Sequence, residues 1–395
     1  MSQFPEERLD LSAEQGFGYF PAYPGLALKQ NRYKVIRKLG FGPRSSVWLT
    51  TDLTGDFGYT AIKILTVHAT GQKTNELPTL QAIKAAFPTD LPNLHDNFVE
   101  ESHHGKHQCF VLSVLGPDVE TLRLTSPTKS LPVHVVSKII SSVLEPLSAL
   151  HNTGTIHGAI TADNILFFVG QRVEDLDPTL AKLPQSVVQD NITVGAVEYP
   201  IVRSQPIPHG YKWNEKQESI ADCGIYLSNV GHAQSIRNNP TWEKTSANPA
   251  LRPPEVILGT DFNIKTDIWM LGCATYQLLT GEPLVPAAIA EDDNDQLGWV
   301  MGLTRDRIKE AIALKSKNRD DFFTDEGIFF EDIPETDLAA ALKASGKVAE
   351  QDIPETVKFI ERCLTLDPAD RPDVNALHNE RWVQKGLACS CGYCG

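Results

Sequence analysis

The sequence has little positive charge for its size. Its 395 residues include 36 Lys and Arg against 50 Asp and Glu, which gives a formal net charge of -14 at pH 7. This balance disfavours general binding to nucleic acids or to anionic membranes, and it would suit a basic protein partner. Solubility alone explains the charge of most acidic proteins. The composition therefore argues against direct nucleic-acid contact without identifying a partner.

Long apolar segments are also absent from the sequence. No run of eighteen apolar residues occurs, and residues 1–16 lack the basic-then-apolar pattern of a secretory signal. We therefore expect no transmembrane segment. We also expect an intracellular protein, located in the cytoplasm, the nucleus or both.

Seven cysteines fall into two groups. Four are scattered among apolar or mixed neighbours, which predicts reduced thiols inside the core: Cys109, Cys223, Cys273 and Cys363. Three crowd the last seven residues: Cys389, Cys391 and Cys394. Three thiolates could complete part of a metal site or carry acyl chains, but a flexible tail with exposed thiols is the simpler expectation.

The first third of the chain has the period of β-strands. Residues up to about 30 carry Pro, Gly and aromatic side chains, which predicts an extended lead-in. Residues 33–39 alternate as a strand does, and strands at 46–51 and 59–65 follow. The turn 40–45 contains two glycines, which would let backbone amides approach a phosphate. A plain hairpin turn uses the same residues.

A lysine lies within the otherwise apolar third strand. Lys63 is costly to bury there unless an acidic side chain pairs with it. Glu76 is the candidate partner. Because Pro78 is tolerated only in the first turn of a helix, that helix should begin near Glu76.

Two more apolar patterns follow. Residues 109–115 form a continuous apolar run that ends at Gly116-Pro117, which predicts a buried strand and a hinge. From Ser130 the period becomes helical, with Ser130 as the expected cap and Gly154 at the helix end. Residues 169–215 have little periodicity and predict a partly ordered surface insert.

The loop that begins at His157 reads HGAITADNIL. It resembles the catalytic loop of protein kinases, in which four residues separate His-Arg-Asp from a metal-binding Asn. His157 and Asn164 match that spacing. Ala159 stands at the general-base position, Gly158 replaces the expected Arg, and Thr161 replaces the Lys that usually steadies the phosphate.

The metal-binding Asp-Phe-Gly turn of kinases has two possible counterparts. Asn229 directly follows the strand-like residues 225–228 and lies at a typical distance from the segment 251–259, which is similar to the kinase Ala-Pro-Glu motif. A competing register uses Asp222. We prefer Asn229, but under the other register the metal-binding carboxylate survives.

Two further residues resemble structural elements of kinases. Arg371 is placed to form the buried ion pair with Glu255 that occurs across the family. Residues 266–273 begin a helix that is apolar nearly all round, and its Asp267 would brace the catalytic loop through the loop backbone.

The resemblance covers about residues 17–383 and implies an α+β, bilobal protein-kinase fold. The small lobe would be an antiparallel sheet of five strands with one helix, and the larger lobe would be mainly helical. The expected boundaries are a lead-in at 1–30, an N-lobe at 31–115, a C-lobe at 116–383 and a Cys-rich tail at 384–395. The C-lobe would include the insert at about 169–215 and an acidic helical segment at 283–350.

The same resemblance implies an ATP site and a Mg²⁺ site. The residues expected to bind the nucleotide are Leu39, Gly40, Gly42, Val47, Ala61, Lys63, Glu76, Leu112, Ser113, Leu115 and Leu166. Asn164 and Asn229 occupy the metal-ligand positions.

Within the kinases, the chain looks most like the SR-protein kinases, particularly divergent fungal ones. The supporting segments are residues 17–21, 32–40, 45–49 and 163–167, together with an insert between the lobes. That family phosphorylates serines in Arg/Ser-rich splicing factors through an acidic docking groove. The resemblance thus implies a basic, Arg/Ser-rich protein partner, and we expect a monomer.

Two functions follow from the altered catalytic loop. The first is an ATP-binding pseudokinase that acts as a scaffold or regulator, because Ala159 cannot orient a substrate hydroxyl and Asn229 is a poorer Mg²⁺ ligand than Asp. The second is a weakly active serine/threonine kinase, in which Asp163 or Asp222 substitutes for a lost carboxylate.

Overall fold

The computed structural model describes residues 6–72, 75–86, 93–170, 172–242, 248–260 and 262–387. The chain forms two compact units. Unit 1 comprises Met1–Pro117 and Phe167–Gly210, and unit 2 comprises Asp118–Leu166 and Tyr211–Gly395. The three cysteines of the C-terminal tail, at 389, 391 and 394, lie outside the described residues.

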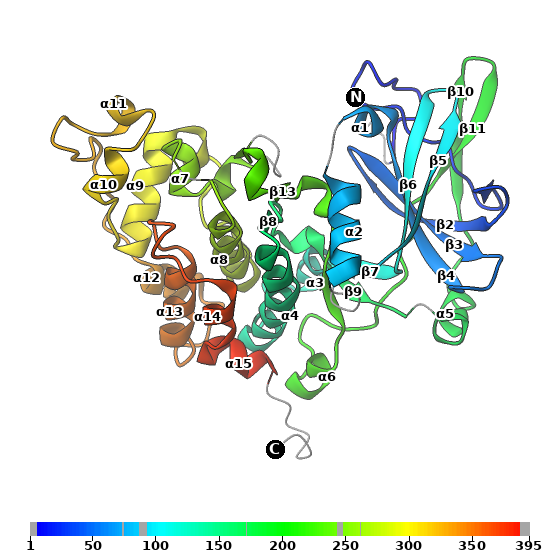
Figure 1. The fold of residues 1–395 in the computed structure, drawn as a ribbon. Helices are drawn as coiled ribbons and strands as arrows, with labels where there is room; N and C mark the ends of the chain where they lie inside the picture. Colours follow the sequence, from blue (N-terminus) through cyan, green and yellow to red (C-terminus); the bar gives the residue numbers. More distant parts are fainter. Residues whose placement is uncertain are drawn as a thin grey trace. The chain divides into compact units, whose positions relative to one another are not determined.

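Unit 1 is built on a six-stranded antiparallel sheet with the strand order β1-β2-β3-β4-β6-β5 (Figure 1). Its strands are β1 (Ala27–Leu28), β2 (Tyr33–Gly42), β3 (Ser45–Asp52), β4 (Tyr59–Leu65), β5 (Leu94–Ser102) and β6 (Gly105–Leu112). The predicted sheet had five strands. The sixth is the short β1, which the lead-in contributes by pairing with Tyr33 and Lys34.

Three helices and a hairpin complete unit 1. They are α1 (Val67–Gly71), α2 (Glu76–Ala86), α5 (Val173–Leu180), β10 (Val188–Val194) and β11 (Val197–Val202). Helix α2 begins at Glu76 with Pro78 in its first turn, as predicted. Helix α1 was not predicted, and the side chain of Thr66 caps it by accepting a hydrogen bond from the Ala69 N–H.

Segments from outside the predicted N-lobe cover the two faces of the sheet. Trp48 belongs to a core that includes Phe20 of the lead-in and Val202 of β11. Its neighbour Leu49 points to the opposite face, where it packs with Leu176 of α5 and Ile207. Strand β3 is thus buried on both faces of the sheet.

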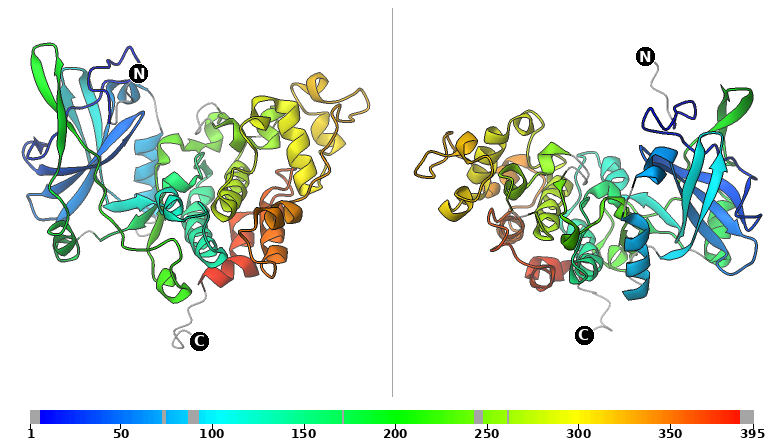
Figure 2. Two further views of the ribbon diagram at one scale, coloured as in Figure 1. Left: turned by 180° about the vertical axis from the view of Figure 1, so that it is seen from behind. Right: turned by 45° about the horizontal axis from the view of Figure 1, so that its top comes forward.

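The insert packs with the sheet of unit 1, although the sequence analysis grouped it with the C-lobe. Its apolar side chains Leu176, Ile201, Val202 and Ile207 are buried. The β10–β11 hairpin runs alongside β5 and β6, where Tyr199 stacks on His103 at 5.1 Å between ring centroids (Figures 1 and 2). The insert therefore belongs to unit 1 and not to the C-lobe, because its apolar side chains are buried against the sheet.

Unit 2 is mainly helical. Its principal helices are α3 (Val119–Thr125), α4 (Val133–Asn152), α6 (Gln217–Ala221), α7 (Pro254–Ile257), α8 (Lys265–Thr280), α9 (Asp293–Thr304), α10 (Glu310–Ala313), α11 (Arg319–Phe322), α12 (Leu338–Ser345), α13 (Ile353–Cys363), α14 (Val374–His378) and α15 (Arg381–Leu387). Short 3-10 turns include η1 (Ala162–Asn164) and η2 (Val230–His232), and short strands include β8 (Thr155–Ile156), β12 (Ile225–Leu227) and β13 (Gln234–Ser235).

Helices α4 and α8 lie side by side at the centre of unit 2 (Figures 1 and 2). Helix α4 starts after Pro132, which occupies the cap position without a side-chain hydrogen bond. The predicted cap, Ser130, instead bonds to Thr128 through its hydroxyl. Helix α4 is long and apolar enough to cross a membrane, but 67% of its most apolar window is buried inside the protein, as in the core helix of a soluble protein.

A buried ion pair joins two distant parts of unit 2. Both guanidinium nitrogens of Arg371 bond to the Glu255 carboxylate, at 2.9 and 3.0 Å, and both side chains are fully buried. This confirms the pair that the resemblance implied. The cysteines at 109, 223, 273 and 363 are buried and free, also as predicted.

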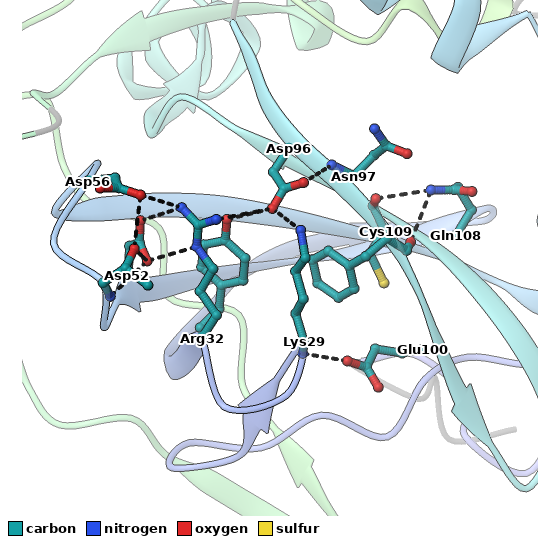
Figure 3. A network of polar contacts seen from close by, with 12 residues as sticks. Lys29, Arg32, Asp52, Asp56, Asp96, Asn97, Glu100, Gln108 and Cys109 are labelled. Carbon is teal, nitrogen blue, oxygen red and sulfur yellow. Dashed lines mark hydrogen bonds and ion pairs between the residues drawn. The ribbon is translucent and has the colours of Figure 1, made fainter.

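A polar network ties the lead-in to the edge of the sheet in unit 1 (Figure 3). Arg32 donates to both oxygens of Asp52, at 3.1 and 3.0 Å, and to the exposed Asp56 at 3.0 Å. Tyr33 and Lys29 donate to Asp96. Burial raises the pKa of Asp52, but hydrogen bonds from Arg32 and Thr54 outweigh it and hold that pKa below its ordinary value.

We predict that Asp52→Asn lowers the free energy of unfolding at pH 7 by about 1.5–3 kcal/mol, because Arg32 loses its charged acceptor in the fully buried Asp52 side chain. The folded-state pKa of Asp52 is depressed, so this stabilisation is complete above the unfolded-state pKa and is lost as the pH falls through the folded one. The difference in the free energy of unfolding between the two proteins should therefore narrow in urea titrations as the pH is lowered from 7 to about 3. Asp56→Asn is the exposed control and should cost about 0.5 kcal/mol or less. An equal deficit for Asp52→Asn at pH 7 and pH 3 would contradict the assignment.

Candidate functional site

The strand register of unit 1 brings predicted nucleotide-binding residues together. Val47 pairs with Gly40 on one side and with Lys63 on the other, and Ala61 pairs with Leu112. The remaining predicted residues of this unit adjoin the same strands: Leu39 and Gly42 in β2, Ser113 directly after β6, and Leu115 at the start of β7 (Leu115–Asp118). Leu166, in β9 (Ile165–Phe168), belongs to unit 2.

Gly40 and Gly42 are not required by the backbone of the turn. Neither has a positive φ, and a Cβ added to either would meet no atom of the described residues within 4 Å. The fold of unit 1 alone would thus accept larger residues at both positions. Open space beside two glycines is what a ligand that approaches the backbone requires.

Lys63 and Glu76 form the predicted ion pair. Lys63 Nζ lies 2.5 Å from Glu76 Oε1, and the two side chains are 13% and 6% exposed. Strand β4 and the first turn of α2 supply the two charges. Because both charges are mostly removed from water, each needs the other. Their contact with a nucleotide stays a prediction.

In unit 2, one carboxylate holds the loop that begins at His157. The buried Asp267 accepts hydrogen bonds from the N–H groups of His157 and Gly158, both at 2.8 Å. His151 Nε2 lies 2.9 Å from the same carboxylate. Gly158 has a φ of 74°, a left-handed conformation that glycine adopts without strain. The predicted brace from Asp267 is therefore present.

The side chain of His157 is fully buried and connects the loop to β12. Its Nε2 lies 3.0 Å from the carbonyl of Ser228, so this nitrogen must donate, and its Nδ1 accepts from the Ala159 N–H at 3.2 Å. Burial lowers the pKa of His157, which fits this neutral tautomer. His157 thus has a structural role.

The reactive positions of the loop hold groups that satisfy one another. Ala159 is fully buried and offers no side-chain acid or base. The Asn164 amide nitrogen donates to the Ala159 carbonyl at 3.0 Å and to the Thr161 hydroxyl at 2.9 Å. These two hydrogen bonds therefore satisfy the Asn164 amide nitrogen without a carboxylate at position 159.

The structure brings Asn164 together with Asn229 and not with Asp222. Asn229 Nδ2 donates to Asn164 Oδ1 at 3.0 Å. Asn229 follows β12 in a left-handed conformation with a φ of 62°, which Asn tolerates better than most residues. Asp222 is exposed at the end of α6. The geometry thus favours the register that uses Asn229.

The donor set at this place does not fit Mg²⁺ well. Mg²⁺ prefers carboxylate oxygens in proteins, whereas both residues here are neutral amides and one donates to the other. Within the described parts of the chain, no three His, Cys, Asp or Glu side chains gather as a metal site requires. Asp163, a candidate substitute, lies within the loop directly before Asn164 and is exposed.

Sequence reasoning gave no role to Asp118, whose carboxylate caps α3 by accepting from the Thr121 N–H at 2.6 Å. Burial raises the pKa of Asp118, and the nearby charge of Asp163 raises it further. An Asp directly after Gly116-Pro117 and before a helix is a typical cap signal, and it could have identified this residue.

Comparison with known proteins relates this chain to protein kinases. The family model described as "Protein kinase domain" matches residues 214–383. The chain is 23% identical to "Protein kinase dsk1" of Schizosaccharomyces pombe, over 93% of this chain and 83% of that protein. It is 27% identical to "Serine/threonine-protein kinase SRPK" of Physarum polycephalum, over 78% of this chain and 75% of that protein.

Two further matches extend the comparison. The chain is 35% identical to "SRSF protein kinase 3" of Mus musculus over 39% of this chain and 28% of that protein. A crystal structure of a kinase domain superposes with a TM-score of 0.62 and 17% identity, covering 92% of this chain and 98% of the other, which shows the fold alone. Together with the sheet of unit 1 and the helices of unit 2, these matches identify the chain as a member of the protein kinase superfamily that resembles the SR-protein kinases.

Proposed function

We propose that this chain is an SR-protein-kinase-like pseudokinase that binds ATP and acts as a scaffold or regulator. The observation that carries the proposal is the hydrogen bond between the Asn164 and Asn229 amides, at the two positions where a kinase places its metal ligands. An intracellular location, in the cytoplasm, the nucleus or both, stays a prediction.

Unit 1 supports the nucleotide-binding half of the proposal. The buried Lys63–Glu76 pair supplies the cation that would contact the α/β-phosphates. Gly40 and Gly42 leave the backbone of the turn open to phosphate oxygens. A plain hairpin turn would not require two glycines beside a buried Lys–Glu ion pair.

Unit 2 supports the loss of phosphoryl transfer. Transfer depends on metal ions that neutralise developing charge and on an Asp that orients the attacking hydroxyl. Ala159 supplies no such group, and a positioned acid–base group contributes about 10²–10⁴-fold in rate. Thr161 removes a cation and instead accepts a hydrogen bond from Asn164. Ala159, Thr161 and Asn229 therefore all lack the charge that a kinase places at these positions.

The proposed partner is a basic, Arg/Ser-rich protein. A pocket of about 750 Å³ in unit 2 is lined by apolar residues that include Pro283 and Val285, by Arg252, and by the acidic residues Glu291, Asp292 and Asp293. A basic segment could place its cations against these carboxylates. The arrangement fits the charge of -14 and the similarity to SRSF protein kinase 3.

The catalytic half is tested with radiolabelled ATP, Mg²⁺ and Arg/Ser peptides, with an active SR-protein kinase as the control for the peptides. We expect no transfer above that of Asn164→Ala, because Ala159 stands where an Asp would orient the attacking hydroxyl. Transfer by the wild type that Asn164→Ala abolishes would establish the alternative, a weak serine/threonine kinase. In that case Asp163→Asn and Asp222→Asn would show which residue substitutes for the lost carboxylate.

The binding half is tested by thermal unfolding with ATP. At about one hundred times its dissociation constant, ATP should stabilise the wild type by about 2.7 kcal/mol, seen as a rise of a few degrees in Tm. Lys63→Met should abolish this rise because the phosphates lose their cation. Lys106→Met, on the adjacent strand β6 and exposed, is the matched control and should keep it. An equal rise in all three proteins would show that ATP binds elsewhere.

A further inference from the structure

The glycine-rich turn of unit 1 is fixed by the lead-in segment 17–19. Tyr19 donates a hydrogen bond from its hydroxyl to the Gly42 carbonyl at 2.8 Å. The peptide bond that follows Gly42 leads to Pro43, which has no N–H, so this carbonyl is the polar group of that peptide unit. Tyr19 therefore orients the backbone of the turn at its second glycine.

Tyr19 is well placed to act as a rigid support. It is only 3% exposed, and the ring of Phe17 stacks on it at 6.0 Å between centroids. Burial raises the pKa of Tyr19 to about 12, so the hydroxyl stays protonated and can donate at any physiological pH.

Three consecutive backbone amides anchor the lead-in and the turn to the same place. The N–H groups of Val67 and His68, at the start of α1, donate to the carbonyls of Gly18 and Phe17 at 2.9 and 3.1 Å. The preceding N–H, of Thr66, donates to the Arg44 carbonyl of the turn at 2.8 Å. The turn is thus held at Arg44 by Thr66 and at Gly42 by Tyr19.

A buried ion cluster secures the rest of the lead-in beside the turn. Lys38, fully buried in β2, pairs with Glu6 at 2.6 Å and also with Glu7. Its ammonium lies 4.6 Å from the centroid of the Phe41 ring, inside the glycine-rich turn. The lead-in is therefore also tied to β2 at Lys38, two residues before the first glycine of the turn.

We propose that Tyr19 is a positioning residue for nucleotide binding: it holds the turn Gly40–Arg44 in the conformation that receives the phosphates. This rests on the proposed binding of ATP. Tyr19 touches no ligand itself and acts through the Gly42 carbonyl. A turn released from Tyr19 has to be ordered when the phosphates bind, which lowers the affinity.

The test compares Tyr19→Phe with Tyr33→Phe, measuring ATP affinity by calorimetry. Each substitution deletes one hydroxyl from a buried tyrosine of unit 1. Tyr33 is a matched control because its hydroxyl also donates one hydrogen bond, to Asp96 at 2.9 Å. We expect Tyr19→Phe to raise the Kd for ATP about 3- to 10-fold, the effect of one hydrogen bond, and Tyr33→Phe to leave it within about twofold. A purely structural role would give both variants the same Kd.

Hydrogen exchange without nucleotide provides a second readout. The amides of residues 39–47 should exchange about 3- to 10-fold faster in Tyr19→Phe than in the wild type and remain unchanged in Tyr33→Phe. Equal exchange or equal ATP affinity in the two variants would overturn the positioning role. If the wild type binds no ATP, the proposed function fails, and the exchange experiment still decides whether Tyr19 fixes the turn.

Discussion

A single buried carboxylate defines the loop on which the interpretation of this protein depends. Asp267 receives the N–H groups of His157 and Gly158, and His151 lies against it. A carboxylate removed from water is stable only when such donors satisfy it, and each of these contacts is stronger than a bond between neutral groups. The loop is therefore shaped by Asp267 in α8. These contacts use no side chain at position 159.

Under the proposed function, this separation explains how a kinase fold persists without phosphoryl transfer. The Glu255–Arg371 pair, the Asp267 brace and the His157 contact to Ser228 all maintain the packing of unit 2. None of them requires a metal ion or a general base. At the reactive positions, the amide of Asn164 bonds to Asn229, so the polar groups there are satisfied without magnesium. Stability and reactivity are thus supplied by different residues.

Local chemistry made several features predictable from the sequence. A lysine inside an apolar strand demanded a partner, and Pro78 fixed the start of the helix that supplies Glu76. The spacing of His157 and Asn164 located the loop, and the strand before Asn229 indicated its register. These inferences rely on neighbours in sequence, on the cost of a buried charge, or on motifs with fixed spacing.

Contacts between distant segments were not predictable in the same way. The β1 strand, the packing of the insert against β3 and the Tyr19–Gly42 hydrogen bond join residues that share no periodic pattern. The prediction that Ser130 caps the helix was wrong, because Pro132 occupies the cap position and Ser130 bonds to Thr128 instead. In each case tertiary packing decided between local options that the sequence left nearly equal.

The central claim is that the positions of the metal ligands no longer favour Mg²⁺, and calorimetric titration of ATP into the full chain tests it most directly. The titration is performed once with EDTA and once with excess Mg²⁺. Because two hydrogen-bonded amides stand where carboxylates would bind the ion, the account predicts dissociation constants that agree within about threefold. Binding that is tenfold or more tighter with Mg²⁺ would contradict it, since such a gain of about 1.4 kcal/mol requires the protein to bind the metal ion.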